Sequence, residues 1–138
     1  AMIDTSGKAA DIMTRHLVTA HHDHTFTELC RLLFEVKVHH LPVVDDQQRL
    51  LGIISANDAL RAFSYNLSDL TGMDEAAINR KIKVEDLMTT LPFTVQPDTP
   101  VEQVMAIFAQ HSFQSLPVVE AGRLVGIITV RDIIKNLP

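Results

Sequence analysis

A long internal repeat constrains the fold of this chain more than any other feature of the sequence. The stretch LPVVDDQQRLLGIISANDAL at 41–60 returns as LPVVEAGRLVGIITVRDII at 116–134. The stretch DIMT at 11–14 returns as DLMT at 86–89, and the same spacing separates the two LPVV motifs. Self-similarity at a fixed spacing indicates a repeated structural unit. A unit of roughly 55 residues buries too little apolar surface to be stable alone, so we expect the two copies to share one core.

Both copies predict the same order of elements, which is strand, helix, strand, strand, helix. The first strand is expected at 16–20 in the first copy and at 92–95 in the second. The helix that follows is amphipathic, because apolar residues recur at i, i+3, i+4 and i+7. These residues are Phe26, Leu29, Cys30 and Leu33 in the first copy, and Val101, Val104, Met105 and Phe108 in the second.

The start of this helix carries a capping signal in both copies. Thr99 and Glu102 have the spacing of a capping box, and Pro100 between them suits the first helical position. Thr25 and Glu28 offer a similar box in the first copy. We therefore expect a helix to begin directly after each threonine.

A hairpin and a final helix complete each copy. In the first copy Leu41–Val44 and Leu50–Ile54 flank a polar turn, whereas the second copy turns more tightly around Ala121–Gly122. These runs are apolar nearly throughout, which predicts strands that are buried on both faces or packed against helices. The final helix is expected to begin at Ser55 or Thr129. Its apolar stripe is clearest in the second copy, at Val130, Ile133, Ile134 and Leu137.

The repeat divides the chain into three parts. Repeat one is assigned to 8–64 and repeat two to 83–138, while 65–82 has no counterpart and is interpreted as a linker. Within the linker, 73–81 is polar and predicted to be helical, where it would cover an open face or form a partner surface. The predicted fold class is α+β, with two tandem βαββα repeats packed sheet to sheet.

Composition narrows the function classes. Hydrophobic residues make up 46% of the 138 residues and charged residues 21%, as in ordinary globular proteins. The net charge is −5 and the basic residues are scattered, which disfavours a nucleic-acid partner. No apolar run approaches the ~20 residues that span a membrane, and no signal-peptide pattern begins the chain. The single cysteine, Cys30, cannot form an internal disulfide, which favours a reducing cytoplasmic location.

Three motifs together carry a family resemblance. Both copies contain Asp-x-Met-Thr, then Leu-Pro-Val-Val, then Gly-Ile-Ile-[Ser/Thr]-x-x-Asp, in this order. This pattern resembles a pair of cystathionine-β-synthase (CBS) domains, and it covers nearly the whole chain apart from the linker. The resemblance implies a disc-like module with pseudo-two-fold symmetry. It also implies two clefts between the repeats that bind adenosine-containing ligands such as AMP, ADP, ATP or S-adenosylmethionine.

The resemblance further implies which residues would contact the ligand, with each cleft combining both repeats. Site 1 would comprise Met13, Arg15, Val18, Val38, His39, Ile127, Thr129, Arg131 and Asp132. Site 2 would comprise Met88, Phe93, Phe113, Gln114, Ile53, Ser55, Asn57 and Asp58. Phe93 would either stack on the adenine or fill the pocket.

Elementary chemistry supports the Ser/Thr-x-x-Asp ending of each repeat as a nucleotide site. A hydroxyl at a helix N-terminus lies beside unpaired backbone N–H groups that suit a phosphate. A carboxylate one turn later can accept hydrogen bonds from ribose hydroxyls, as in other nucleotide folds. The same pattern is also a capping box, and one set of residues can serve both purposes. We expect the tighter binding at site 1, because Arg131 offers a fixed positive fork where site 2 has Asn57.

Histidines raise the alternative of a metal-responsive protein. HHDH at 21–24, with His39 and His40 as further ligands, would suit zinc or nickel. However, the stretch falls where a strand gives way to a helix and adjacent side chains diverge, and repeat two has an ordinary Gln-Pro-Asp-Thr turn at 96–99. We therefore predict no metal site, and we keep the alternative open for replacement of His22 and His24 to test.

The remaining expectations concern activity and partners. Cys30 lies on the apolar helix face and is interpreted as a structural thiol, and no nucleophile-base arrangement is found, so we predict that the chain is not an enzyme. From the resemblance we expect a stand-alone bacterial regulatory protein that requires no cofactor. It would form a homodimer of CBS pairs and modulate an unknown protein partner. The rival interpretation is a structural, dimerising module whose clefts bind nothing.

Overall fold

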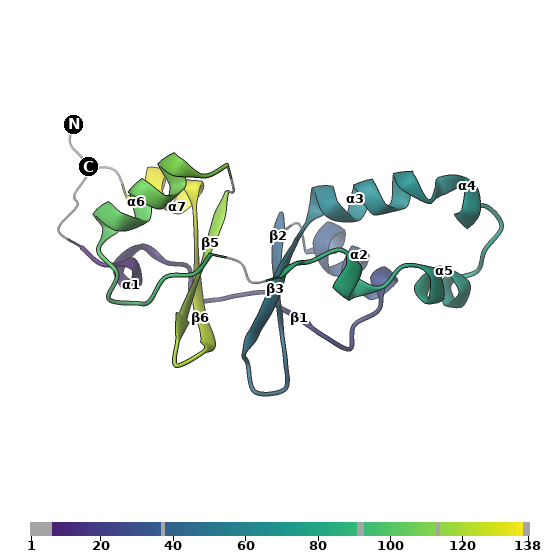
Figure 1. Cartoon of the computed structure of the whole chain (residues 1–138), viewed down its shortest axis with the longest axis horizontal. Coiled ribbons are helices and arrows are strands. Elements are labelled where there is room, and N and C mark those ends of the chain that lie inside the picture. The colour runs from purple at the N-terminus through teal and green to yellow at the C-terminus, as the bar shows by residue number, and fades with distance from the viewer. Residues whose placement is uncertain (1–6, 37, 91–92, 113, 137–138) are drawn as a thin grey trace. The chain divides into compact units, whose positions relative to one another are not determined.

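A computed structural model describes residues 7–36, 38–90, 93–112 and 114–136 of the 138-residue chain. The chain is α+β and divides into two compact units (Figure 1). The central unit is Val18–Leu91, and the terminal unit combines Ala1–Leu17 with Pro92–Pro138. Each unit therefore contains the hairpin of one repeat and the leading segment of the other, where the leading segments are 8–17 and 84–90. The structural units do not coincide with the sequence repeats.

The central unit contains a four-stranded sheet in the order β1-β2-β3-β4. β1 (Ala20–His21) is parallel to β2 (His40–Val44), and β2 is antiparallel to β3 (Leu50–Ser55). β4 (Thr89–Thr90), from the second repeat, is antiparallel to β3. The expected first strand at 16–20 is thus shorter and later than predicted, because pairing with β2 begins only at Ala20.

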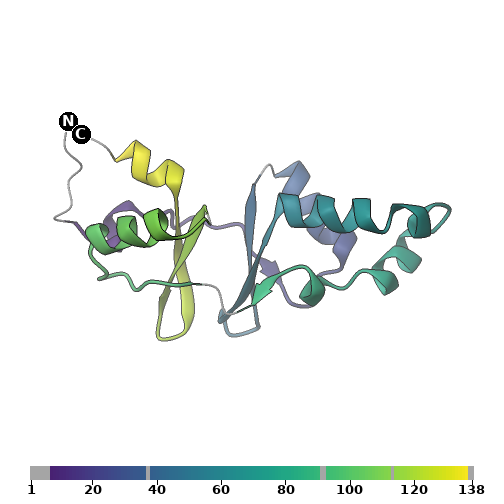
Figure 2. The same cartoon turned by 45° about the horizontal axis from the view of Figure 1, so that its top comes forward.

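Helices cover one side of this sheet (Figures 1 and 2). They are α2 (Phe26–Glu35), α3 (Ala56–Tyr65), α4 (Leu67–Leu70) and α5 (Glu75–Lys81), followed by the 3-10 helix η1 (Val84–Asp86). Phe26, Leu29 and Leu33 of α2 are buried with Leu41 and Ile54 of the sheet in one cluster. Each such side chain contributes on the order of 1.5–3 kcal/mol through removal of apolar surface from water.

The linker packs against α2, as the first of the two roles that the sequence allows for it requires. The Thr27 N–H donates to Asn79 Oδ1 at 3.0 Å. Glu75 accepts from the Thr27 hydroxyl at 2.7 Å and from Arg31 at 2.8 Å. Both linker residues belong to α5, so the predicted helix is confirmed and it covers a helix of the central unit.

The terminal unit is built around the hairpin of β5 (Ser115–Glu120) and β6 (Arg123–Thr129). Ala121 and Gly122 both have positive φ, 52° and 80°, as the tight turn predicted from the sequence requires. The helices are α1 (Ala9–Ile12), α6 (Val101–Gln110) and α7 (Val130–Lys135). The core of this unit consists of Ala9, Val95, Val104, Leu116, Val118 and Ile128.

Of the two predicted capping boxes, one forms and the other does not. The box at Thr25 and Glu28 is confirmed, because each side chain accepts from the backbone N–H of the other. The box at Thr99 is wrong: the Thr99 hydroxyl accepts from the Gln96 N–H at 3.0 Å and closes the preceding turn. Pro100 is therefore the N-cap of α6, without a side-chain cap.

The predicted apolar stripe of α7 is only partly buried in the terminal unit. Val130 and Ile134 are 42% and 60% exposed, whereas Ile133 packs against the core. Leu137 lies outside the described residues.

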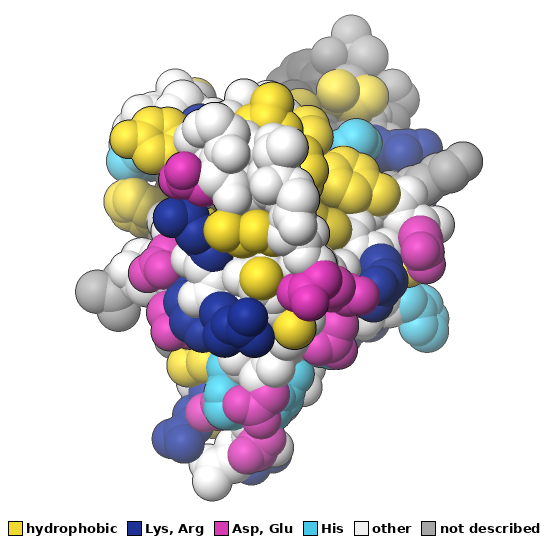
Figure 3. Space-filling model, turned by 90° about the vertical axis from the view of Figure 1, so that its right-hand side faces the viewer, with side chains coloured by type: hydrophobic (Ala, Val, Ile, Leu, Met, Phe, Trp, Pro, Cys, Tyr) yellow, Lys and Arg dark blue, Asp and Glu magenta, His cyan; other side chains and the backbone are white. Residues whose placement is uncertain are grey.

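None of the helices in the described part of the chain is long and apolar enough to cross a membrane. The face in Figure 3 shows basic and acidic side chains interspersed, without a continuous basic stripe.

Candidate ligand-binding sites

Two glycines allow each leading segment to lie directly on the hairpin of the other repeat. A Cβ on Gly52 would lie 2.7 Å from the Thr89 carbonyl oxygen. A Cβ on Gly126 would lie 2.5 Å from Met13 Sδ. Real Cβ atoms do not approach this closely, so the glycine of each Gly-Ile-Ile motif makes room for the crossing segment. These crossings position the two candidate sites.

The Thr129 site is the N-terminus of α7 together with residues 13–15. The Thr14 N–H donates to the Ile127 carbonyl at 2.8 Å, and the Ile127 N–H donates back at 3.1 Å. This pairing puts the Thr14 hydroxyl beside α7, where it donates to Asp132 Oδ1 at 3.0 Å. The leading segment of one repeat and the helix start of the other therefore meet at Asp132.

Asp132 is also the third residue of a capping box. Its Oδ2 accepts from the Thr129 N–H at 2.9 Å and from the Thr129 hydroxyl at 3.1 Å, and its own N–H donates to that hydroxyl at 3.2 Å. Asp132 is 8% exposed, which is rare for a carboxylate without such partners. A carboxylate has about four lone-pair positions, so Oδ1 retains capacity for a further donor.

The Ser55 site is the N-terminus of α3 together with residues 88–90. Ser55 and Asp58 form the same capping box, with distances of 3.1 Å and 3.0 Å. Thr89, the counterpart of Thr14, pairs with Ile53 through the backbone, but no hydrogen bond joins its side chain to Asp58 in this described region. The Asp58 side chain is 28% exposed and lies 3.5 Å from Arg61.

The positive groups also differ between the sites. Arg131 of the Thr129 site is exposed and forms no ion pair within the described part of the chain. Arg15 is exposed too, and its guanidinium donates to the Ala10 carbonyl at 3.3 Å. Asn57 is the exposed counterpart of Arg131 at the Ser55 site. An arginine fork suits a phosphate in a way that an amide does not.

The structure brings together part of each predicted residue set within one unit. From site 1 these are Met13, Arg15, Ile127, Thr129, Arg131 and Asp132, and from site 2 they are Ile53, Ser55, Asn57, Asp58 and Met88.

The other predicted site residues belong to the other unit in each case. Val18 and Val38 pack against the central core, and the carbonyl of exposed His39 accepts from the Ala56 N–H at 2.9 Å. Phe93 is 56% exposed and contacts the His111 ring at 4.4 Å between centroids. Gln114 is exposed, its carbonyl accepts from the Val130 N–H at 3.4 Å, and Phe113 lies outside the described residues. Their membership of the sites stays a prediction.

Thr14 and Thr89 were missed as individual site residues. The signal for them was present, because both are the threonine of the repeated Asp-x-Met-Thr motif. The motif identifies the position but does not reveal that only Thr14 reaches an aspartate.

Two further groups have environments that matter for chemistry. Burial lowers the pKa of His40 below its ordinary value of 6.5, neighbouring His39 adds to this, and Asp58 acts in the opposite direction. Burial raises the pKa of the Cys30 thiol above 9.0, which keeps it protonated and poorly nucleophilic near neutral pH.

Fold and site together define a class: a tandem α+β pair in which each helix start carries a hydroxyl and a carboxylate beside a crossing segment. The CBS domain family matches residues 9–65 and 84–138. The chain belongs to the CBS domain family, and the resemblance drawn from its three motifs is confirmed.

Solved structures of CBS proteins match nearly the whole chain. CBSX2 in complex with AMP is 32% identical, has a TM-score of 0.77, and is matched over 94% of both chains. The CBS domain pair of protein MJ0100, in complex with 5′-methylthioadenosine and S-adenosyl-L-methionine, is 29% identical with a TM-score of 0.75, over 93% of both chains. An acetoin utilization protein (AcuB) from Vibrio cholerae is 30% identical with a TM-score of 0.76, over 93% of this chain and 87% of the other.

Curated relatives are longer proteins. L-aspartate semialdehyde sulfurtransferase of Methanocaldococcus jannaschii is 31% identical over 89% of this chain but only 22% of its own length. A homoserine O-acetyltransferase of Methanococcoides burtonii is 32% identical over 94% of this chain and 24% of its own length. The chain thus spans about a quarter of the length of these two relatives, and the similarity covers only that part of each.

Proposed function

We propose that this CBS pair is a regulatory module that binds an adenosine-containing ligand, AMP, ADP, ATP or S-adenosylmethionine, and thereby modulates a partner protein. The observation that carries the proposal is the Thr129 site. There the leading segment of one repeat crosses the hairpin of the other and meets Asp132 at 3.0 Å. Support comes from two similar CBS pairs whose structures contain AMP or S-adenosyl-L-methionine.

Each part of the ligand has a matching group at this site. The exposed guanidinium of Arg131 and the N-terminus of α7 suit a phosphate, or the carboxylate of S-adenosylmethionine. The Oδ1 atom of Asp132 suits a ribose hydroxyl, which would share this oxygen with Thr14. Because Thr14 and Thr129 already hold the carboxylate in place, little side-chain entropy would be lost on binding.

The Ser55 site is proposed as the weaker of the two. Asp58 is accessible for a ribose, but Asn57 replaces the arginine and Arg61 competes for the carboxylate at 3.5 Å. The affinity of a ligand without a phosphate would be reduced least by having Asn57 in place of an arginine.

Thermal unfolding with AMP, ADP, ATP and S-adenosylmethionine in separate samples tests the proposal. A ligand at 100 times its dissociation constant adds about 2.7 kcal/mol to the free energy of unfolding, which raises the melting temperature measurably. Arg131→Ala should weaken AMP binding by about tenfold or more through loss of a charge-assisted hydrogen bond.

The matched control is Arg123→Ala, which removes an exposed arginine of the same unit at the hairpin turn. Its AMP affinity should equal that of the wild type. Absence of stabilisation by every adenosine ligand, or equal loss in both arginine variants, would contradict the proposal.

A second candidate function is favoured by apolar side chains on helix surfaces. The large apolar residues exposed on α3 and α4 are Leu60 (53%), Phe63 (44%), Tyr65 (90%) and Leu67 (54%). Large exposed apolar groups in one region suit a protein contact, which would make the chain a dimerising module. Sedimentation of the wild type and of Phe63→Ser tests this contact, because a dimer that forms without ligand should dissociate in the variant. Ligand binding separates the candidates, since a purely dimerising module would bind no adenosine ligand.

A further inference from the structure

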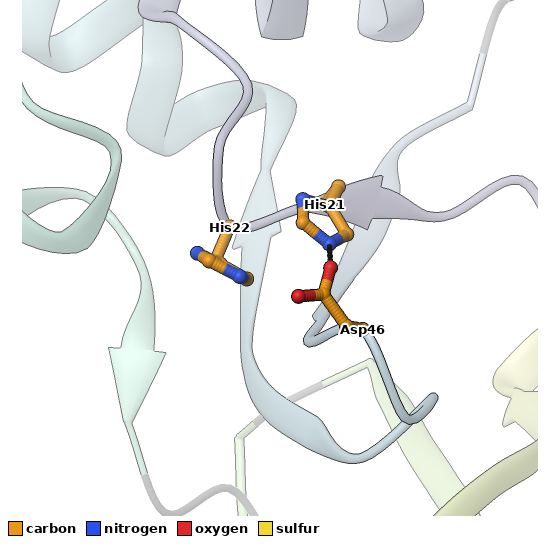
Figure 4. Close-up of side chains that lie close together, drawn as sticks. All are labelled: His21, His22 and Asp46. Atoms are coloured by element: carbon orange, nitrogen blue, oxygen red, sulfur yellow. Dashed lines mark hydrogen bonds and ion pairs between the residues drawn. The ribbon is translucent and has the colours of Figure 1, made fainter.

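A cluster of imidazole and carboxylate groups lies at one end of the sheet of the central unit, and it shares no residue with either candidate site. Its members are His21, His22 and Asp46, whose ligand atoms all lie within 4.8 Å of one another. Figure 4 shows the three side chains together, with His21 Nε2 hydrogen-bonded to Asp46 Oδ1.

Strand pairing creates this cluster. β1 runs parallel to β2 with His21 opposite Val44, and the His22 N–H donates to the Val44 carbonyl at 3.1 Å. The residues after β1 therefore lie beside the turn after β2, where Asp46 is the second residue. We predicted no metal site from the sequence, and the alternative group, HHDH with His39 and His40, is not what the fold assembles, because the third side chain comes from the hairpin turn.

The turn holds Asp46 in a defined place. Asp45 Oδ1 accepts from the Gln47 and Arg49 N–H groups, each at 2.9 Å, and Asp45 Oδ2 pairs with the Arg49 side chain at 3.0 Å. Asp45 thus stabilises the turn and forms the ion pair with Arg49. Asp46 is therefore not paired with Arg49, and its carboxylate accepts the hydrogen bond from His21.

Asp23 supplies outer support for both imidazoles. Its carboxylate lies 3.5 Å from His21 Nδ1 and 3.0 Å from His22 Nδ1. A metal-binding histidine commonly donates its second ring N–H to a carboxylate, which orients the ring and raises its basicity. In the structure the Asp23 N–H donates to His21 Nδ1 at 3.2 Å, so Nε2 carries the proton that it donates to Asp46. An ion at Nε2 would take the place of that proton, which can move to Nδ1 beside the Asp23 carboxylate at 3.5 Å.

The second repeat shows that the fold does not require these residues. Val95 pairs with Val118 in the same parallel sense, yet Gln96 and Pro97 stand where the histidines are, and Ala121 occupies the turn. The same backbone arrangement therefore forms without a single imidazole. The set in repeat one is therefore not a requirement of the fold.

We propose that His21, His22 and Asp46 form a binding site for a divalent transition-metal ion of the zinc and nickel class, oriented by Asp23. Two imidazoles and one carboxylate are ligands that zinc accepts, with water as the fourth, whereas magnesium and calcium prefer oxygen ligands alone. Ligand atoms around tetrahedral zinc lie about 3.3 Å apart. The exposed His22 and Asp46 side chains can close to that distance by small rotations.

Calorimetric titration of the metal-stripped chain, free of any affinity tag, with zinc chloride tests the site. We expect one zinc ion per chain, no response to magnesium chloride, and with cobalt chloride the visible absorption of a tetrahedral ion. Asp46→Asn, an isosteric change in an 82% exposed side chain, should weaken zinc binding by more than about tenfold, and Asp23→Asn by about tenfold.

The control is His16→Gln, an exposed histidine of the terminal unit outside the cluster, which should bind zinc as the wild type does. Circular dichroism of each variant confirms that the fold is kept. Absence of saturable zinc binding by the wild type would overturn the proposal. So would equal affinity in wild type and Asp46→Asn, since the His21–Asp46 pair would then be only a hydrogen bond that fastens the turn.

Discussion

At the Thr129 site and the Ser55 site the same capping box forms, but the two aspartates have different surroundings. Asp132 is 8% exposed and bonded to Thr14 from the crossing segment. The Asp58 side chain is 28% exposed and has an arginine from its own helix at 3.5 Å. The repeated motif thus determines the helix start in both repeats, whereas contacts across the repeats determine how firmly each carboxylate is held. Four predictions test this difference.

The largest effect is expected from crowding the crossings. Gly52→Ala places a Cβ 2.7 Å from the Thr89 carbonyl, and backbone cannot move aside without breaking the β3–β4 pairing. Gly126→Ala meets only side-chain atoms of Met13, of which Sδ at 2.5 Å and Cγ at 2.9 Å can rotate away. We expect a loss of about 3 kcal/mol in the free energy of unfolding for Gly52→Ala and about 1 kcal/mol for Gly126→Ala, measured in urea. Equal losses would show that the two crossings are equally rigid.

Truncating the aspartates should come next. Asp132→Ala removes the acceptor of the capping box and that of Thr14, whereas Asp58→Ala removes the capping acceptor alone. Counting about 1 kcal/mol for loss of the helix cap and about 1 kcal/mol for loss of the Thr14 hydrogen bond, we expect about 2 kcal/mol for Asp132→Ala and about 1 kcal/mol for Asp58→Ala. Urea unfolding measures both. A larger loss of unfolding free energy in Asp58→Ala than in Asp132→Ala would show that Asp58, not Asp132, is the more firmly held carboxylate.

A double-mutant cycle isolates the contact that distinguishes the sites. Thr14→Val and Asp132→Ala, alone and combined, should show a coupling of about 1 kcal/mol in the free energy of unfolding, because the side chains are hydrogen-bonded. The cycle of Thr89→Val with Asp58→Ala should show a coupling near zero. Coupling in both cycles would mean that the second threonine also reaches its aspartate in solution.

The smallest effect concerns pH and belongs to the Ser55 site alone. Burial depresses the pKa of His40, whereas repeat two has Ser115 at this position. In the unfolded chain His40 takes up a proton near its ordinary pKa of about 6.5, whereas in the folded chain it does so only at a lower pH. The free energy of unfolding therefore falls as the pH falls from about 6.5 through the lowered pKa of His40.

His40→Ser copies the residue of repeat two and should reduce the dependence of the melting temperature on pH between about pH 7 and about pH 5, the range in which histidine titrates. The comparison is with the wild type in the same buffers. Identical slopes for the two proteins would contradict the assignment to His40.

Much of the fold follows from the sequence, because its signals are local. The runs Leu41–Val44 and Leu50–Ile54 form β2 and β3, and both Ser/Thr-x-x-Asp patterns cap helices. The predicted capping box at Thr99 was wrong because a capping pattern does not determine from which N–H the hydroxyl accepts a hydrogen bond. There the preceding turn competed with the helix.

The sites were only partly predictable because they depend on pairing between distant segments. The crossing of leading segments followed from the family resemblance, but nothing local shows that Thr14 reaches Asp132 while Thr89 remains apart. The metal cluster could not be foreseen either. It needs the register of β1 on β2, which brings a turn residue, Asp46, to the two histidines.

The most direct test of the central claim is calorimetric titration of AMP into the wild type, Asp132→Asn and Asp58→Asn. The asparagine variants keep the side-chain shape and so largely spare the fold. We predict saturable binding to the wild type, a loss of affinity of about tenfold or more in Asp132→Asn, and a much smaller change in Asp58→Asn. AMP binding that is lost only in Asp58→Asn, or that is equal in all three proteins, would contradict the claim.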